Sequence, residues 1–142
     1  MTVEELEMQL ALGSLTRKMK MDLTNNLNTP KKMLIELSRD KDWDVRSSVA
    51  SNPYTPKKIL TMLSKDKDWR IRYKVASNPN TPKKVLTILS TDESWNVRYT
   101  VAYNPNTSKK ALATLSMDKD WSVRSRALES FNNGNNNDNQ RI

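Results

Sequence analysis

A segment of 26 residues is repeated four times in tandem and covers about three quarters of the chain. Residues 52–77 read NPYTPKKILTMLSKDKDWRIRYKVAS, and near copies lie directly before and after them. The four units span residues 26–51, 52–77, 78–103 and 104–129. A period of about 20 to 50 residues is typical of a solenoid, in which each unit packs mainly against its neighbours. The repeat therefore predicts one elongated domain.

The first half of each unit predicts a short amphipathic helix. In the second unit Thr55 is a favoured N-cap residue, and Pro56 suits the first helical position, where its missing N–H costs nothing. Ile59, Leu60 and Leu63 follow at a spacing that places them on one face. Apolar residues recur at these positions in the other units, so we expect this face to be core.

The second half of each unit predicts another helix. The position before each tryptophan holds a favoured N-cap type, namely Asp42, Asp68, Ser94 and Asp120. Ile71, Val75 and Ala76 are the expected buried residues of the second unit. An Asn-Pro pair at 52–53, 78–79 and 104–105 should end the helix, because the residue before proline is pushed out of the α region.

The two ends of the chain depart from the repeat. Residues 1–25 predict a helical N-terminal cap, broken at Gly13, whose second piece is a degenerate half repeat. Residues 130–142 include the tract NNGNNNDNQRI, which has almost nothing to bury. We expect this Asn-rich tail to be disordered.

The composition restricts the chemistry that the chain can perform. It has no histidine and no cysteine, which removes imidazole bases, thiolate nucleophiles, disulfides and the usual zinc and iron–sulfur ligands. We therefore expect no metal, no cofactor and no enzymatic activity. With 24 Lys and Arg against 16 Asp and Glu the net charge is +8, which favours anionic partners.

The N-terminal residues are acidic where a signal peptide would be basic, and no apolar run is long enough to span a membrane. These features predict a cytoplasmic protein without membrane partners. We also expect it to be a monomer.

The repeated pattern NPxTPxxxLxxLxxDxxWxVRxxVA resembles the leucine-rich repeat variant family and, more broadly, HEAT-like helical repeats. The resemblance implies an all-α, right-handed α-solenoid of four two-helix repeats, with one helix of each pair partly of the 3₁₀ type. The family's prototype carries an N-terminal cysteine-rich iron–sulfur segment, and this chain lacks cysteine, so that cofactor is not carried over. Some alkylpurine DNA glycosylases are also built from HEAT-like repeats, but a shared fold does not transfer their activity.

An aspartate stands six residues before an arginine in every unit, and in HEAT-like repeats a similar pair forms a hydrogen-bond ladder. The pairs are Asp40 and Arg46, Asp66 and Arg72, Asp92 and Arg98, and Asp118 and Arg124. We favour this structural role, since the planar guanidinium suits a fixed carboxylate partner. The alternative is an arginine stripe that binds phosphates.

A tryptophan begins the second helix of every unit, at Trp43, Trp69, Trp95 and Trp121. We expect these rings to pack between the helix layers, because one large ring can enlarge a thin core. A stacking platform for unpaired bases is the less favoured alternative.

A lysine pair stands at the second and third predicted positions of each first helix, where the helix dipole disfavours cations. The pairs are Lys31 and Lys32, Lys57 and Lys58, Lys83 and Lys84, and Lys109 and Lys110. They are either solvated lysines inherited by duplication, which we favour, or an anion-binding rim.

The second unit has seven basic and two acidic residues, so it holds most of the excess positive charge. Arg70 and Lys74 belong to it, and Tyr73 and Tyr99 are candidates for a contact surface beside basic groups. The sequence thus predicts a non-enzymatic repeat scaffold that binds a protein through the concave face and the basic edge. The alternative is a DNA- or RNA-binding module that contacts the phosphate backbone.

Overall fold

The computed structural model describes residues 1–139, and this part of the chain forms ten α-helices and no strand. Two N-terminal helices precede the repeats, α1 (Val3–Ala11) and α2 (Arg17–Asn25). The first helices of the four units, hereafter the A helices, are α3 (Lys31–Leu37), α5 (Lys57–Leu63), α7 (Lys83–Leu89) and α9 (Lys109–Leu115). The second helices, hereafter the B helices, are α4 (Trp43–Ser51), α6 (Trp69–Ser77), α8 (Trp95–Tyr103) and α10 (Trp121–Asn139). The chain is an α-solenoid, as predicted.

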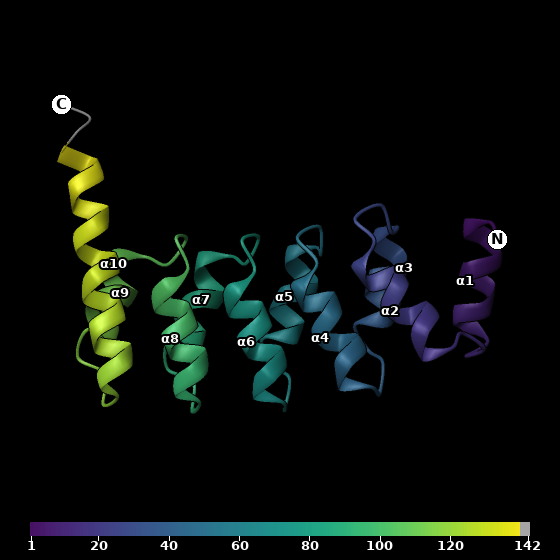
Figure 1. The fold of residues 1–142 in the computed structure, drawn as a ribbon, viewed down its shortest axis with the longest axis horizontal. Coiled ribbons are helices and arrows are strands. Elements are labelled where there is room, and N and C mark those ends of the chain that lie inside the picture. The colour runs from purple at the N-terminus through teal and green to yellow at the C-terminus, as the bar shows by residue number, and fades with distance from the viewer. Residues whose placement is uncertain (140–142) are drawn as a thin grey trace.

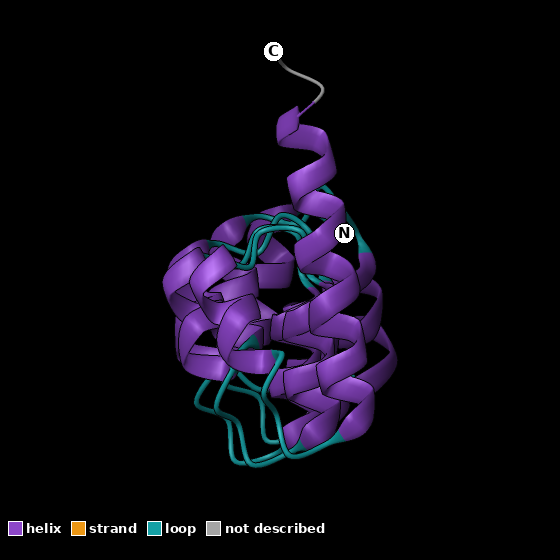
Figure 2. Ribbon diagram, turned by 90° about the vertical axis from the view of Figure 1, so that its left-hand side faces the viewer, coloured by secondary structure: helices purple, strands orange, loops and turns teal. Residues whose placement is uncertain are grey.

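The helix pairs line up from one end of the molecule to the other in chain order (Figure 1). The B helices form one layer with α2 at its N-terminal end, and each contacts the next directly, whereas the A helices lie behind them. The connecting loops gather at two edges of the array (Figure 2). One edge holds the loops that lead into the B helices, and the opposite edge holds those that lead into the A helices.

The core is a continuous row of apolar side chains between the two layers. Leu60 of α5 and Ile71 and Val75 of α6 are fully buried, as are their equivalents in the neighbouring units. Ala76 is fully buried too, with Ala50 and Ala102 in register. The predicted apolar faces of both helices are therefore confirmed.

The B helices begin with aspartate caps, as predicted, in three of the four units. The Asp42 and Asp68 side chains accept hydrogen bonds from the backbone N–H groups of Asp44 and Arg70, both at 3.0 Å, and Asp120 does the same in the last unit. Ser94 makes no such bond, so the predicted cap is wrong there. The B helices end at Asn52, Asn78 and Asn104, whose extended backbone precedes proline as expected.

The A helices start differently from the prediction. Thr55 is fully buried and its hydroxyl donates to the carbonyl of Val49 at 2.6 Å, so it closes the preceding B helix instead of capping the A helix. The last carbonyls of a helix lack intrahelical partners, which explains this use. Helix α5 then begins after Pro56, which makes Lys57 and Lys58 its first two residues. In the last unit Ser108 replaces the proline, and its side chain accepts from the N–H of Ala111.

Two further predictions about helices are wrong. All helices within residues 1–139 are α-helical, so no helix of a pair is of the 3₁₀ type. The disorder expected for residues 130–142 is contradicted up to Asn139, because α10 continues that far and Phe131 packs against the core. A helix whose first turns are held by packing gains one hydrogen bond for each added residue, without a new nucleation cost. Residues 140–142 lie outside the described part of the chain.

Candidate functional site

The arginines of the repeats form a buried ladder. Arg98 donates from Nε and Nη2 to the two carboxylate oxygens of Asp118 in the next unit, at 2.8 and 3.0 Å. Its Nη1 donates to the backbone carbonyl of Asp92 in its own unit at 2.8 Å. Arg46 and Arg72 make the same contacts, and Lys20 takes the place of an arginine for Asp40 at 2.6 Å. Each unit is thus tied to the next by an ion pair and to itself by a backbone contact.

Arg98 and Asp118 stabilise each other's charged forms. Hydrogen bonding to Asp118 raises the pKa of Arg98 further above its ordinary value. Burial by itself would raise the pKa of Asp118, but the hydrogen bonds from Arg98 and from the backbone N–H of Asp120 outweigh it and lower that pKa. With their donors occupied, Arg46, Arg72 and Arg98 do not form a stripe open to phosphates. Arg124 belongs to the last of the four units, and among the described side chains and backbone of residues 1–134 it donates only to the carbonyl of Asp118.

A second ladder, of asparagines, was missed by the sequence analysis. Asn78 is 2% exposed, and its Nδ2 donates to the carbonyls of Ala50 and Asn52, at the C-terminal end of α4, at 2.7 and 3.0 Å. Its Oδ1 accepts from the N–H of Asn80. Asn52 and Asn104 repeat the arrangement. The Asn-Pro pair therefore does more than end a helix: its asparagine links adjacent units.

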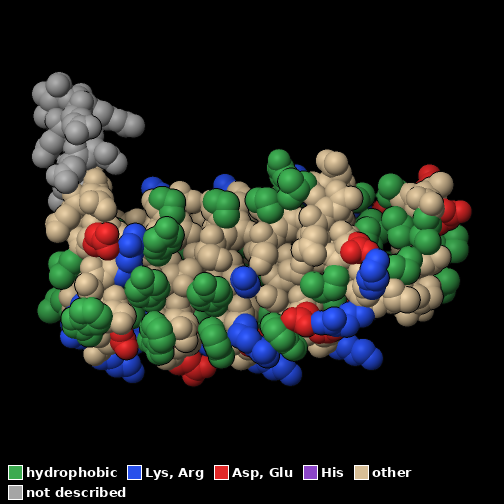
Figure 3. Space-filling view, viewed as in Figure 1, with side chains coloured by type: hydrophobic (Ala, Val, Ile, Leu, Met, Phe, Trp, Pro, Cys, Tyr) green, Lys and Arg blue, Asp and Glu red, His purple; other side chains and the backbone are tan. Residues whose placement is uncertain are grey.

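The tryptophans contradict the prediction that they pack in the core. Trp43, Trp69, Trp95 and Trp121 are 37%, 43%, 47% and 71% exposed. Figure 3 shows hydrophobic side chains spaced along the face over the B helices. These four tryptophans with Tyr73, Tyr99 and Tyr103 are called the aromatic face below.

The helical phase within the sequence could have placed the rings correctly. Consecutive helical residues differ by about 100°, so Trp69 lies about 200° from the buried Ile71, on the opposite side of α6. Tyr73 is also two residues from Ile71, and it therefore shares the outer side with Trp69. The edge-to-face contact of these two rings, with centroids 6.4 Å apart, follows from this phase. Trp95 and Tyr99 repeat the contact at 6.5 Å.

Arg70 is the basic residue most closely tied to the aromatic face. Its guanidinium lies 3.5 Å from the ring centre of Trp43 in the preceding unit. It also pairs with Asp68 through Nε and Nη2, at 3.0 and 2.7 Å. The hydrogen bonds from Arg70 lower the pKa of Asp68 to about 2. Lys74 lies 5.7 Å from the Tyr73 ring centre, and it has no carboxylate partner among the side chains described for residues 1–134.

Shallow hollows separate the B helices along this face. The hollow between α4 and α6 is lined by Trp43, Trp69 and Tyr73. The one between α6 and α8 is lined by Tyr73, Trp95, Tyr99 and Tyr103. Tyr99 and Trp121 border a third, between α8 and α10. The aromatic face is therefore a series of similar depressions rather than one deep pocket.

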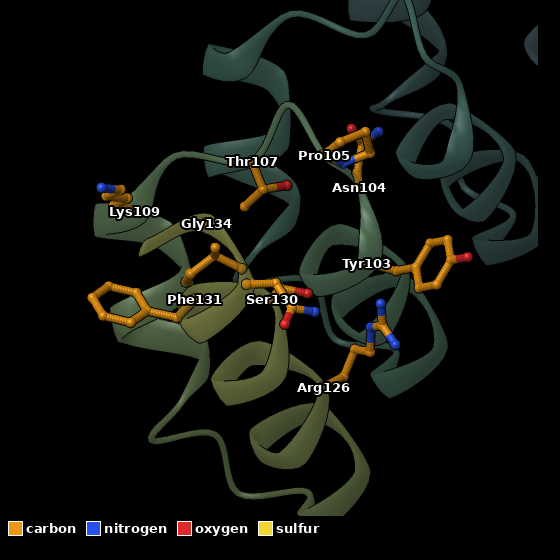
Figure 4. A pocket seen from close by; sticks show the side chains of 11 residues that line it. Tyr103, Asn104, Pro105, Thr107, Lys109, Arg126, Ser130, Phe131 and Gly134 are labelled. Atoms are coloured by element: carbon orange, nitrogen blue, oxygen red, sulfur yellow. The ribbon is translucent and has the colours of Figure 1, made fainter. Parts of the chain in front are cut away.

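The last unit adds a pocket where α8, α9 and α10 meet (Figure 4). Tyr103 and Arg126 stand at one end of it, with the guanidinium 4.2 Å from the ring centre. Arg126 also pairs with Glu129 at 3.1 Å, and its buried Nε has no hydrogen-bond partner in the part of the chain whose side chains are described. Tyr103 thus belongs both to this pocket and to the aromatic face.

The lysine pairs lie away from the aromatic face. All eight lysines are exposed at the starts of the A helices, at the loop edge opposite the one where the tryptophans begin the B helices. Lys32 pairs with Glu7 of α1 at 3.3 Å. The predicted basic edge and the predicted contact tyrosines therefore lie on different parts of the surface.

Among residues 1–134, whose side chains the structure describes, no group of acidic, histidine or cysteine side chains is placed to hold a metal ion. No helix within residues 1–139 is long and apolar enough to cross a membrane.

Among solved structures, the chain is similar to one described as a leucine-rich repeat variant with a novel repetitive protein structural motif. The two share 25% sequence identity and superimpose with a TM-score of 0.74 over 92% of this chain. The aligned part is 51% of the neighbour, so this chain spans about half its length. No family model and no curated protein matches the chain. The resemblance expected from the repeated pattern is therefore found at the level of the fold, and a repeat fold of this kind fits a scaffold role.

Proposed function

We propose that this protein is a non-enzymatic scaffold that binds another protein through its aromatic face. The observation that carries the proposal is the row of four tryptophans, one at the start of each B helix, all between 37% and 71% exposed. Tryptophan, tyrosine and arginine are the residues that contribute most to binding energy at protein interfaces. The aromatic face combines all three on a layer of packed helices.

The four tryptophans lie outside the buried core, although Tyr99 of the same face packs against it. The core is filled by Leu, Ile, Val and Ala side chains, and adjacent units are joined by the arginine and asparagine ladders. Four large apolar rings left at the surface oppose solubility, since exposed apolar patches on soluble proteins mark interaction sites or aggregation liabilities. Their retention in every unit is best explained by a ligand that covers them.

A peptide display selection tests this function. Random peptides would be enriched on the wild-type chain and counter-selected on a variant carrying Trp69→Ala and Trp95→Ala. We expect peptides that bind the wild type and lose about tenfold or more of their affinity for the variant. The matched control is Lys83→Ala with Lys84→Ala, at the opposite edge, which should leave binding unchanged. Selected peptides that bind both chains equally would contradict the proposal.

Nucleic-acid binding is the second candidate, supported by the net charge of +8 and the exposed lysine pairs. It predicts binding to random-sequence DNA whose affinity falls steeply with salt, with a logarithmic slope of about −0.9 per phosphate contact on duplex DNA. Lys57→Glu with Lys58→Glu should abolish that binding, whereas Trp95→Ala should not. A salt-insensitive signal, or none at low salt, would rule it out.

A further inference from the structure

We propose that the ligand of the aromatic face is a proline-rich segment in the polyproline II conformation that runs across the B helices, with acidic residues among its prolines. This inference rests on the proposed function and specifies the partner's chemistry. It draws on the spacing of the rings, on their free polar groups and on the charges beside them.

The spacing of the B helices matches one turn of polyproline II. Packed helices lie about 8–10 Å apart, so equivalent rings such as Trp69 and Trp95 recur at about that interval along the array. A polyproline II segment has three residues per turn and rises about 3.1 Å per residue, or about 9.3 Å per turn. Every third residue of the segment would therefore meet an equivalent hollow on the same side.

Other backbone conformations fit less well. A β-strand presents the same side every second residue, about 6.6 Å, which does not coincide with the repeat. An α-helix returns to the same side after seven residues, about 10.5 Å, and so also matches the spacing. The spacing alone leaves polyproline II and α-helix as candidates.

The polar groups of the aromatic face favour polyproline II over a helix. The indole N–H groups and the tyrosine O–H groups of this face make no hydrogen bond to another residue within 1–134, the range whose side chains are described. Asn96 and Ser122, which line the same hollows, also leave their side-chain polar groups unpaired within that range. In a helical ligand most backbone carbonyls already accept hydrogen bonds within the helix. In polyproline II every carbonyl is free to accept a hydrogen bond from another molecule. Aromatic-lined grooves bind proline-rich segments by this combination of ring contact and hydrogen bonding.

The charges along the aromatic face favour an acidic ligand. Lys74 stands beside Tyr73 without a carboxylate partner, while Arg70 and Arg126 are each balanced by one acidic residue, Asp68 and Glu129. The chain as a whole carries +8. An acidic residue placed between prolines would thus meet Lys74 and be steered by the overall charge.

A single-stranded nucleic acid fits the same face poorly. Its bases could stack on the rings, but the phosphates would need cations beside them. Asp68 and Glu129 already occupy Arg70 and Arg126, and the lysine pairs lie at the opposite edge.

Intrinsic fluorescence can report directly on the aromatic face, because the chain's four tryptophans all belong to it. The probe is a synthetic peptide of about six Glu-Pro-Pro triplets, titrated into the intact chain. We expect a blue shift of the indole emission and reduced quenching by acrylamide. Trp95→Ala should weaken binding about tenfold, and Lys83→Ala should not. Replacing each Glu of the peptide with Lys should weaken binding severalfold.

Peptide length provides a second measurement that does not depend on a variant. The four tryptophans, at intervals of about 9–10 Å, are spanned by roughly nine to twelve residues of polyproline II. Affinity should therefore rise with length up to about twelve residues and then level off. If affinity continued to rise far beyond that length, the peptide would not be bound across the B helices as proposed.

Two rival probes separate the failure of this inference from failure of the proposed function. If a helical peptide with leucines at heptad spacing binds in a Trp95-dependent way and the proline peptide does not, the inference is overturned and the proposed function stands. If a thymidine oligonucleotide alone binds in a Trp95-dependent way, both are overturned. If no defined peptide binds, the inference falls, and the display selection decides the proposed function independently.

Discussion

The arginine row and the tryptophan row recur with the same period, only three residues apart, and they meet opposite environments. Arg98 is charged, yet its side chain is 6% exposed and its donors are occupied by Asp118 and Asp92. Trp95 carries the largest aromatic side chain, yet it is 47% exposed and its N–H has no partner among the side chains and backbone described for residues 1–134. Recurrence in every unit therefore does not by itself identify a structural residue. The two rows differ in whether the neighbouring units supply hydrogen-bond partners for the side chain.

The largest effect expected on stability comes from breaking a rung of the arginine ladder. Arg98→Ala would leave the Asp118 carboxylate, 9% exposed, without its partner. Removing one member of a buried ion pair costs about 3–5 kcal/mol. Urea unfolding should show this loss. Arg124→Ala, which removes only the contact to a carbonyl at the end of the array, is the matched control and should cost less than about 1 kcal/mol. Equal losses at the two positions would refute the ladder as a connection between units.

The asparagine ladder should give the next largest effect. Asn78→Ala removes two hydrogen bonds to buried carbonyls and one from the N–H of Asn80. Leaving buried polar groups unpaired costs about 1–3 kcal/mol, so we expect a loss near 2 kcal/mol in urea unfolding. Asn96→Ala, on the aromatic face, is the control and should change stability by less than about 0.5 kcal/mol.

Acid should destabilise the fold through Asp68 and Asp118, whose pKa values are lowered in the folded chain. A lowered carboxyl pKa stabilises the fold above the unfolded value of about 3.9 and loses that contribution as the pH falls toward 2. Because Arg70 is partly exposed and screened, we expect Asp68 to contribute only about 1 kcal/mol. As the pH falls from 5 to 2, the thermal unfolding temperature should decline less steeply for Asp68→Asn than for the wild type. Parallel profiles would show that the Arg70–Asp68 pair adds no stability.

The smallest effect on stability is expected from the tryptophans. A buried tryptophan replaced by alanine costs about 3–5 kcal/mol, but Trp95→Ala should cost less than about 1 kcal/mol, because the residue is 47% exposed and lies outside the core. Chemical unfolding of this variant, with Leu86→Ala as the buried comparison, measures the difference. A loss of stability as large as that of Leu86→Ala would show that the tryptophans are part of the core.

The sequence predicted the solenoid well because the repeat period, the apolar faces and the Asn-Pro breaks are local patterns. It also supplied both members of each Asp–Arg pair, although the ion pair joins Arg98 to Asp118 of the next unit while the contact within the unit uses the backbone of Asp92. Which unit supplies the carboxylate depends on how units stack. That geometry is set by packing between units and is not encoded in the spacing.

The aromatic face was mispredicted because residue size was given more weight than helical phase. Trp69 was assigned to the core because a large ring buries much area, while its angular distance from Ile71 indicated the outer side. Thr55 was similarly assigned as a cap from residue type, but its hydroxyl turns back to Val49. A given residue type can form several different hydrogen bonds, and the positions of the neighbouring backbone groups determine which one it forms.

Acrylamide quenching of the wild-type chain tests most directly whether the tryptophans form an open binding face. We expect red-shifted emission typical of partly exposed indoles and quenching well above that of buried tryptophan, with Trp121 the most accessible and Trp43, covered by Arg70, the most protected. A blue-shifted emission with several-fold weaker quenching in the absence of any ligand would contradict this expectation.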